Sequence, residues 1–150
     1  MFKKILFPTD FSEPSRSALD YVKKLKDSGA EEIIVLHVID DRDIPVFLGL
    51  DEGDPVSGAQ LEKTLTLIEE NAKDETQAIA AELQDLGFHV TVRIEKGSAF
   101  REILRIEEEE QVSVIVLGSH GKGLVKGMLL GSVSEKVIRK SKKPVMVIKE

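Results

Sequence analysis

Residues 112–117 read Val-Ser-Val-Ile-Val-Leu, and they lead directly into the stretch Gly118-Ser119-His120-Gly121. A second apolar run, Ile-Ile-Val-Leu, occupies residues 33–36. Runs of this kind are typical of strands that are covered on both faces, as in a parallel sheet between two layers of helices. The two stretches therefore predict the centre of an α/β fold.

The segments around these two runs alternate between strand-like and helix-like patterns. We expect strands at residues 5–7, 32–39, 88–94, 112–117 and 145–148, and helices that begin after Ser12, at Leu61, at Gly97-Ser98 and at Ser132. Strands that alternate with helices form parallel sheets through right-handed crossovers. The pattern predicts a three-layer α/β/α fold with a five-stranded parallel sheet, and we expect its strands in the order 3-2-1-4-5.

Two segments have a different character. Residues 40–60 contain prolines and glycines without a sustained hydrophobic period, which predicts a long loop. Residues 88–95 alternate strictly between apolar and polar side chains, which favours a strand near an edge of the sheet.

Length and composition restrict the class of protein. The chain has 150 residues, of which 41% are hydrophobic, and it has no cysteine. A chain of this length buries roughly 70% of its unfolded surface, so one domain over residues 1–150 needs no disulfide or structural metal. The missing cysteines exclude thiolate zinc sites and cysteine catalysis. No apolar run approaches the roughly 20 residues of a membrane helix. We expect a cytoplasmic protein without a membrane partner.

Charge is distributed unevenly along the chain. The net charge is −6, yet residues 120–150 hold eight lysine or arginine residues against two glutamates. The overall acidity argues against a nucleic-acid partner, while the basic segment is compatible with an anion site. We expect Lys122 and Lys126 to steer phosphate groups. Cations near the end of the last helix are expected to complement its dipole instead, namely Arg139, Lys140, Lys142 and Lys143.

The ends of the first and fourth strands are the candidate binding region. In a sheet of this order, ligands bind beyond the carboxyl ends of the strands where the order reverses. Those ends are Pro8-Thr9-Asp10 and residues 118–121. Residues 118–131 hold five of the eleven glycines, and clustered backbone amides can form an anion-binding concavity. Gly131-Ser132 then starts a helix, whose free amides suit a phosphate.

Common catalytic and phosphate motifs do not fit this stretch. A P-loop requires a lysine and a hydroxyl residue after its last glycine, but Leu124 and Val125 follow Gly123. In the dinucleotide fingerprint, Lys126 occupies the place of the third glycine. Ser119 and His120 are adjacent and do not by themselves form a nucleophile and base pair. We assign no catalytic residue and no protein ligand for a metal.

The spacing Gly118-x2-Gly121-x9-Gly131-Ser132 resembles the nucleotide-binding signature of the universal stress protein family, in its ATP-binding branch. The likeness extends to residues 5–12, 35–38, 97–103 and 141–147. It implies a Rossmann-like domain of the adenine nucleotide alpha hydrolase-like kind. It also implies a homodimer in which the strand Val145 to Ile148 pairs across a two-fold axis.

The resemblance also implies which residues bind the nucleotide. Pro8, Thr9 and Asp10 would line the adenosine pocket, and Val38 would offer main-chain contacts to adenine. The residues implied at the ribose and phosphates are Leu117, Gly118, His120, Gly121, Gly131, Ser132, Val133 and Ser134. From the residues alone, Asp10 has three open roles: it can position a ribose hydroxyl, hold a divalent metal or help cap the first helix.

Three functions stay open at this point. The first is a nucleotide-dependent regulatory or signalling switch in the stress response, with ATP as the ligand. The second is a slow metal-dependent ATPase or phosphotransferase, with Mg²⁺ or Mn²⁺ bound through the phosphates. The third is a nucleotide-independent dimeric interaction module, which the intact glycine signature disfavours.

Two further features receive structural interpretations. His37 lies inside an expected strand, so we interpret it as a structural strand residue. The acidic run Glu107 to Glu110 stands at the end of an expected helix, where four acids are usually a solvated face.

Overall fold

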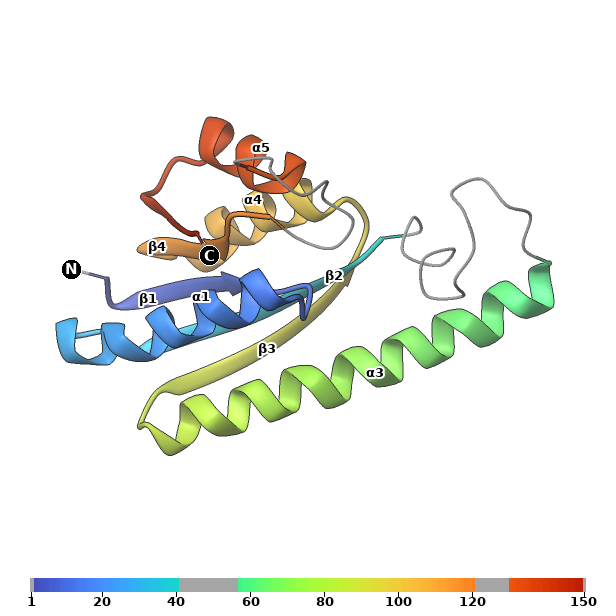
Figure 1. Ribbon diagram of the computed structural model, residues 1–150, viewed down its shortest axis with the longest axis horizontal. Coiled ribbons are helices and arrows are strands. Elements are labelled where there is room, and N and C mark those ends of the chain that lie inside the picture. Colours follow the sequence, from blue (N-terminus) through green and yellow to red (C-terminus); the bar gives the residue numbers. More distant parts are fainter. Residues whose placement is uncertain (1, 41–56, 121–129, 150) are drawn as a thin grey trace.

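The computed structural model describes residues 2–40, 57–120 and 130–149, and its elements follow the predicted alternation (Figure 1). The strands form one parallel sheet in the order β3-β2-β1-β4-β5, which confirms the predicted fold class and strand order. In chain order the elements are β1 (Lys4–Pro8), α1 (Glu13–Lys24), the 3₁₀ helix η1 (Leu25–Ser28), β2 (Glu32–Ile39), α3 (Gly58–Asp85), β3 (His89–Lys96), α4 (Ala99–Glu110), β4 (Val114–Gly118), α5 (Ser132–Lys140) and β5 (Val145–Ile148).

Helices cover both faces of the sheet. α1 and α3 lie on one side and α4 and α5 on the other (Figure 1). Alternation along β1 explains this arrangement, because Ile5 and Phe7 pack with α1 and α3 while Leu6 packs with α4 and α5. All three side chains are fully buried, and each such burial stabilises the fold by about 2 kcal/mol.

Helix α1 begins as the sequence predicts. The Ser12 hydroxyl accepts a hydrogen bond from the Ser15 N–H at 3.4 Å, and Pro14 lies in the first turn. Gly29 adopts a left-handed conformation with φ of 94° after η1, which suits glycine at the end of a helix. The Ser12 cap thus sets the start of α1 after β1, and Gly29 lies at the turn that leads from η1 to β2.

Helix α3 is the longest element, with 28 residues. It begins at Gly58, so the last three residues of the predicted loop are helical, because the Ser57 hydroxyl accepts a hydrogen bond from the Gln60 N–H at 3.1 Å. Residues 41–56 of that loop lie outside the described residues. The N-terminal turns of α3 extend past the end of the sheet (Figure 1). Neither α3 nor any other helix in the described ranges is long and apolar enough to cross a membrane.

Strand β3 forms one edge of the sheet, as its alternating pattern predicts. Its Arg93 donates hydrogen bonds to Glu95 at 2.8 Å and to Glu109 of α4 at 3.0 Å. Burial alone lowers the pKa of Arg93, but the hydrogen bonds and charges of these two glutamates outweigh it and raise the pKa. The edge therefore carries charged side chains in a fixed ion-pair network, which hinders pairing with another chain.

The acidic run at the end of α4 is not a uniform solvated face, so that interpretation was wrong for Glu107. Its side chain is only 4% exposed. Its carboxylate accepts hydrogen bonds from the Lys142 N–H at 3.0 Å, the Lys143 N–H at 2.8 Å and the Ser141 hydroxyl. Glu107 therefore holds the turn between α5 and β5 against α4.

Candidate functional site

The candidate site lies where β1 and β4 end side by side. The two strands are parallel neighbours, with Leu6 opposite Ile115, so their carboxyl ends reach the same edge of the sheet. The strand order reverses at this point, because β2 lies on the far side of β1 and β5 on the far side of β4. This is the position at which open α/β sheets bind ligands.

Thr9 anchors the loop that follows β1, and only 7% of it is exposed. Its N–H donates to the Leu36 carbonyl at 2.8 Å, and its hydroxyl oxygen accepts from the Phe11 N–H at 3.1 Å. The Ser15 hydroxyl also donates to the Thr9 hydroxyl, at 2.6 Å. Next to it, the Asp10 carboxylate accepts the Ser12 N–H at 3.0 Å, so Asp10 helps to shape the helix entry.

His37 supports the same loop from the neighbouring strand β2. It is a buried strand residue, as interpreted from the sequence, and its Nδ1 lies 2.8 Å from the Thr9 carbonyl oxygen. Because a carbonyl only accepts, Nδ1 carries the proton in this bond. The imidazole also stacks on the Phe11 ring at 4.4 Å, and Phe11 has a left-handed φ of 66°. Phe11 was not predicted as a site residue, since no local sequence pattern shows that its ring stacks on His37.

Val38 lies on β2 beyond the end of the β1 ladder. The last ladder pair joins Pro8 to Leu36, and the Leu36 carbonyl points toward β1, where it accepts the Thr9 N–H. The backbone N–H and C=O groups of successive residues in a strand point to opposite sides. Val38 follows Leu36 by two residues, so its N–H and C=O also point toward the β1 side. They therefore face the space above the end of β1, where a planar ring edge can be read by backbone groups.

Gly118 closes the end of β4 against α1. A Cβ at Gly118 would lie 2.8 Å from the carbonyl carbon of Pro14 and 2.9 Å from its oxygen. Leu117, just before it, is buried in the core between the sheet and the helices α4 and α5. The Ser134 hydroxyl donates to the Gly118 carbonyl at 2.8 Å, which ties α5 to the strand end.

Helix α5 begins directly beside β4. The Gly131 N–H donates to the Ser119 carbonyl at 2.8 Å, and a Cβ on Gly131 would lie 3.1 Å from the Cα of His120. Gly131 is the N-cap and provides no side-chain cap, so the first amides of α5 are open to an anionic ligand. Of the first two helical residues, Ser132 is exposed and Val133 is half-buried.

His120 and Ser119 are in contact at this strand end. The Ser119 hydroxyl lies 3.0 Å from Nδ1 of His120, but Ser119 is only 3% exposed. We interpret this bond as one that orients the imidazole, because a buried hydroxyl cannot reach a substrate. Among the residues that the structure covers, no three His, Asp or Glu side chains are grouped to hold a metal ion.

The predicted site residues that the structure describes all lie at or next to the carboxyl ends of the strands. They come from the β1 loop, the end of β2, the end of β4 and the first turn of α5: Pro8, Thr9, Asp10, Val38, Leu117, Gly118, His120, Gly131, Ser132, Val133 and Ser134. Gly121, Lys122 and Lys126 lie outside the described residues.

A cavity of about 600 Å³ opens at the same edge, between the starts of α4 and α5. Ser132 and Val133 line it from α5, and Ser98 and Phe100 line it from the start of α4. Charged side chains also line it, namely Asp40, Lys96, Arg101 and Lys136. Sequence analysis did not single out these four residues, because they come from four different elements or connections.

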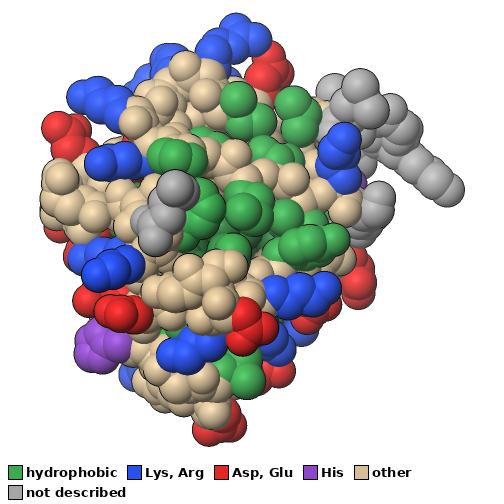
Figure 2. Space-filling view, turned by 90° about the vertical axis from the view of Figure 1, so that its left-hand side faces the viewer, with side chains coloured by type: hydrophobic (Ala, Val, Ile, Leu, Met, Phe, Trp, Pro, Cys, Tyr) green, Lys and Arg blue, Asp and Glu red, His purple; other side chains and the backbone are tan. Residues whose placement is uncertain are grey.

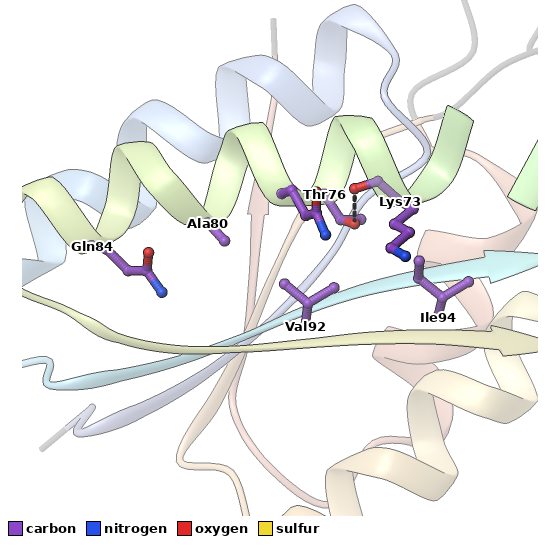
Figure 3. A pocket seen from close by; sticks show the side chains of 7 residues that line it. Lys73, Thr76, Ala80, Gln84, Val92 and Ile94 are labelled. Atoms are coloured by element: carbon purple, nitrogen blue, oxygen red, sulfur yellow. Dashed lines mark hydrogen bonds between the residues drawn. The ribbon is translucent and has the colours of Figure 1, made fainter. Parts of the chain in front are cut away.

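A second hollow, of about 560 Å³, lies between α3 and β3, away from the strand ends. Figure 3 shows Val92 of β3 below Ala80 and Thr76 of α3, with Lys73 and Ile94 at one end of the hollow and Gln84 at the other. The Thr76 hydroxyl donates to the Ala72 carbonyl at 2.7 Å, so it is already satisfied within the helix. The hollow lies away from the carboxyl ends of the strands, where open α/β sheets bind their ligands, so we do not take it as the candidate site.

The strand order and the helices on both faces define a doubly wound α/β protein, with a candidate ligand site at the carboxyl ends of its strands. The universal stress protein family model matches residues 1–149, and the chain belongs to that family. The chain is 46% identical to universal stress protein MJ0577 of Methanocaldococcus jannaschii over 158 aligned positions, which cover 99% of this chain and 96% of the relative. The solved structure of MJ0577 superposes with a TM-score of 0.86 at 45% identity, covering 100% of this chain and 97% of that one.

More distant solved structures share the fold and were determined with nucleotides. A universal stress protein family member from Arabidopsis thaliana with AMP bound has a TM-score of 0.67 at 16% identity, over 99% of this chain and 92% of that one. A universal stress protein in complex with cAMP has a TM-score of 0.62 at 19% identity, over 99% and 97%.

Proposed function

We propose that this protein binds ATP in the crevice between the β1 loop and the end of β4, and that nucleotide occupancy acts as a regulatory or signalling state. The observation that carries the proposal is the start of α5, which is tied to β4 by the Gly131–Ser119 hydrogen bond and has no side-chain cap. Open amides at a helix start favour a phosphate. The nucleotide complexes of fold relatives support an adenine nucleotide as the class of ligand.

The remaining groups at the edge fit the other parts of such a ligand. The backbone of Val38 faces the space above β1, which suits the edge of an adenine ring. Thr9 and Asp10 lie in a loop that is held by several hydrogen bonds, so a ribose would meet an ordered surface. In this proposal an accompanying Mg²⁺ or Mn²⁺ is bound through the phosphates, because the described residues offer no ligand cluster of their own.

We propose that the protein signals by whether ATP is bound, and not by rapid hydrolysis of ATP. Phosphoryl transfer depends on a group that positions the attacking nucleophile and on cations that stabilise the transferred charge. His120 lies beside the N-cap residue of α5, since a Cβ on Gly131 would be 3.1 Å from its Cα, and its Nδ1 is in contact with Ser119. Release of ADP that depends on a metal and stops on loss of nucleotide binding would instead support the ATPase alternative.

Titration calorimetry with ATP, combined with extraction of nucleotide from the purified protein, tests this proposal. We expect ATP to bind, and we expect Asp10→Asn to weaken binding by about 10- to 100-fold if the carboxylate contacts the ribose or the ion. The asparagine keeps an oxygen for the Ser12 N–H, so the helix entry stays intact. Asp20→Asn, the same change on the exposed side of α1, is the matched control. Absence of both extracted nucleotide and measurable binding would contradict the proposal.

We also propose that the protein forms a homodimer through β5. This strand is an edge of the sheet, and of its four residues only Ile148 is buried. An apolar edge strand leaves backbone groups unpaired, which favours pairing with a second copy. Figure 2 shows hydrophobic side chains gathered on one side of the molecule among charged ones, a surface typical of interaction sites.

Val147→Pro is expected to convert the dimer into a monomer. The carbonyls of Pro144 and Ile148 accept hydrogen bonds from the β4 side of the strand. The backbone groups of Val147, the residue before Ile148, point the opposite way, so its N–H faces away from β4. Proline removes that N–H and spares the β4 ladder. Sedimentation at micromolar concentration checks the result, and Val147→Ala, which keeps the N–H, is the control. A monomeric wild type, or a Val147→Pro dimer as tight as the wild type, would count against the interface.

A further inference from the structure

A group of three cations surrounds one aromatic ring at the mouth of the strand-end cavity. The Phe100 ring has the Lys136 ammonium 4.7 Å from its centre, and the Arg101 guanidinium and the Lys140 ammonium each at 5.6 Å. Within the described ranges, none of these three side chains has a carboxylate at ion-pair distance, whereas each of the other four arginines there does. Like charges that share one ring repel each other, so the group favours an anion nearby.

Two of these cations line the cavity together with two helix starts. Arg101 and Lys136 line it, while Lys140 lies one turn further along α5. The N-cap residues of α4 and α5 are Ser98 and Gly131, and neither provides a side-chain cap. Open amides from both helices and two cations therefore surround a single space of about 600 Å³.

The other charged side chains that line the cavity, Lys96 and Asp40, do not neutralise the positive charge of Arg101 and Lys136. Lys96 also lines the cavity, and its ammonium pairs with Glu69 of α3. Asp40, at the end of β2, is the acidic side chain of the lining and has its own interactions. Three cationic side chains therefore line this space, namely Lys96, Arg101 and Lys136, against the one carboxylate of Asp40 among the described residues.

The cavity continues directly from the proposed phosphate site, because Ser132 and Val133 belong to both. A phosphate held at the first turn of α5 has this cavity as its neighbour. AMP ends at its single phosphate, whereas ATP has two more phosphates to place. We propose that Arg101 and Lys136 contact the terminal phosphates of a nucleoside triphosphate, so that the site prefers ATP to AMP. This inference rests on the proposed adenine nucleotide site.

Phe100 gives the two cations a fixed place. Long lysine and arginine side chains lose rotamer freedom when they bind an anion, which weakens the contact. Here the ring already holds both side chains, so less freedom remains to be lost on binding. The aromatic ring is thus a positioning group for the cations, and it keeps its half-buried place between α4 and α5.

Calorimetric titration of ATP and AMP into the wild type, Lys136→Gln and Arg101→Gln tests the proposal. We expect each variant to bind ATP about tenfold more weakly while its AMP affinity changes by less than about twofold. Lys142→Gln makes the same change of charge beyond the end of α5, away from the cavity, and serves as the matched control. It is expected to leave both affinities at the wild-type values, because salt screens exposed charges beyond about 8 Å.

The possible outcomes separate this inference from the function on which it rests. An equal loss of ATP and AMP affinity in the variants, or unchanged ATP affinity, overturns the phosphate contact but leaves the nucleotide site standing. A wild type that binds neither nucleotide overturns both. A wild type that binds AMP as tightly as ATP overturns the proposed preference alone.

Discussion

Gly118→Ala is expected to lower the free energy of unfolding by about 2–3 kcal/mol, as is typical when atoms are forced into a closely packed contact. The added Cβ would lie 2.8 Å from the carbonyl carbon of Pro14 and 2.9 Å from its oxygen. These are backbone atoms of the first turn of α1, and Pro14 is itself buried, so the helix must move away from β4. The β1 loop precedes this turn, so the shift separates the two halves of the candidate site.

Urea denaturation of the variant and the wild type measures this effect. Gly58→Ala is the matched control, since nothing lies within 4 Å of a Cβ at that position in the first turn of α3. Alanine favours a helix over glycine, so the control is expected to be neutral or up to about 1 kcal/mol more stable. Identical denaturation midpoints for Gly118→Ala and the wild type would show that the added Cβ fits beside Pro14 without cost, which would contradict the prediction.

Glu107→Ala is expected to lower the free energy of unfolding by about 3 kcal/mol. The change leaves the N–H groups of Lys142 and Lys143 and the hydroxyl of Ser141 without their common acceptor. Ser141 and Lys143 keep hydrogen bonds to each other, but hydrogen bonds to a charged group are each worth about 1.5–3 kcal/mol, and Glu107 is buried. The turn that leads into β5 would lose its attachment to α4.

Glu108→Ala is the control for this variant, because Glu108 is exposed and stands next in the same acidic run. Exposed substitutions of this kind usually change stability by less than about 0.5 kcal/mol. Thermal or urea unfolding of both variants gives the comparison. Equal losses in the two variants would mean that the helix charge, rather than the buried carboxylate, determines the effect.

The parallel α/β fold and the approximate positions of its strands were predictable from the sequence, because the hydrophobic period and the alternation of elements indicate them. The run at residues 33–36 lies in β2 next to the central strand, and the alternating residues 88–95 lie at an edge. The Ser12 cap was predictable from local residue types alone. The start of α3 was missed by three residues because Ser57 caps it from within a glycine-rich and proline-rich stretch.

Other features depend on contacts that no local pattern encodes. Phe11 meets His37 only because β1 and β2 are neighbours, and Phe100 meets Lys136 only because α4 packs beside α5. Glu107 did carry a signal, since it follows Ile103 by four residues and so shares the buried face of α4. The prediction for Glu107 was wrong because it was made from the charge of the whole acidic run, and charge alone does not show which glutamate of a run is buried.

The strand order also determines how the chain reaches its native state. Ile5 of β1 pairs with Ile33 on one side and with Val114 on the other, so the second pairing closes most of the chain into a loop. The entropy lost on closing a loop rises with its length, and distant pairings slow folding. The crevice exists only after β4 has joined β1, so it is completed late. A ligand that binds there therefore stabilises the folded protein, and it gives no stabilisation to a chain in which β4 has not yet paired with β1.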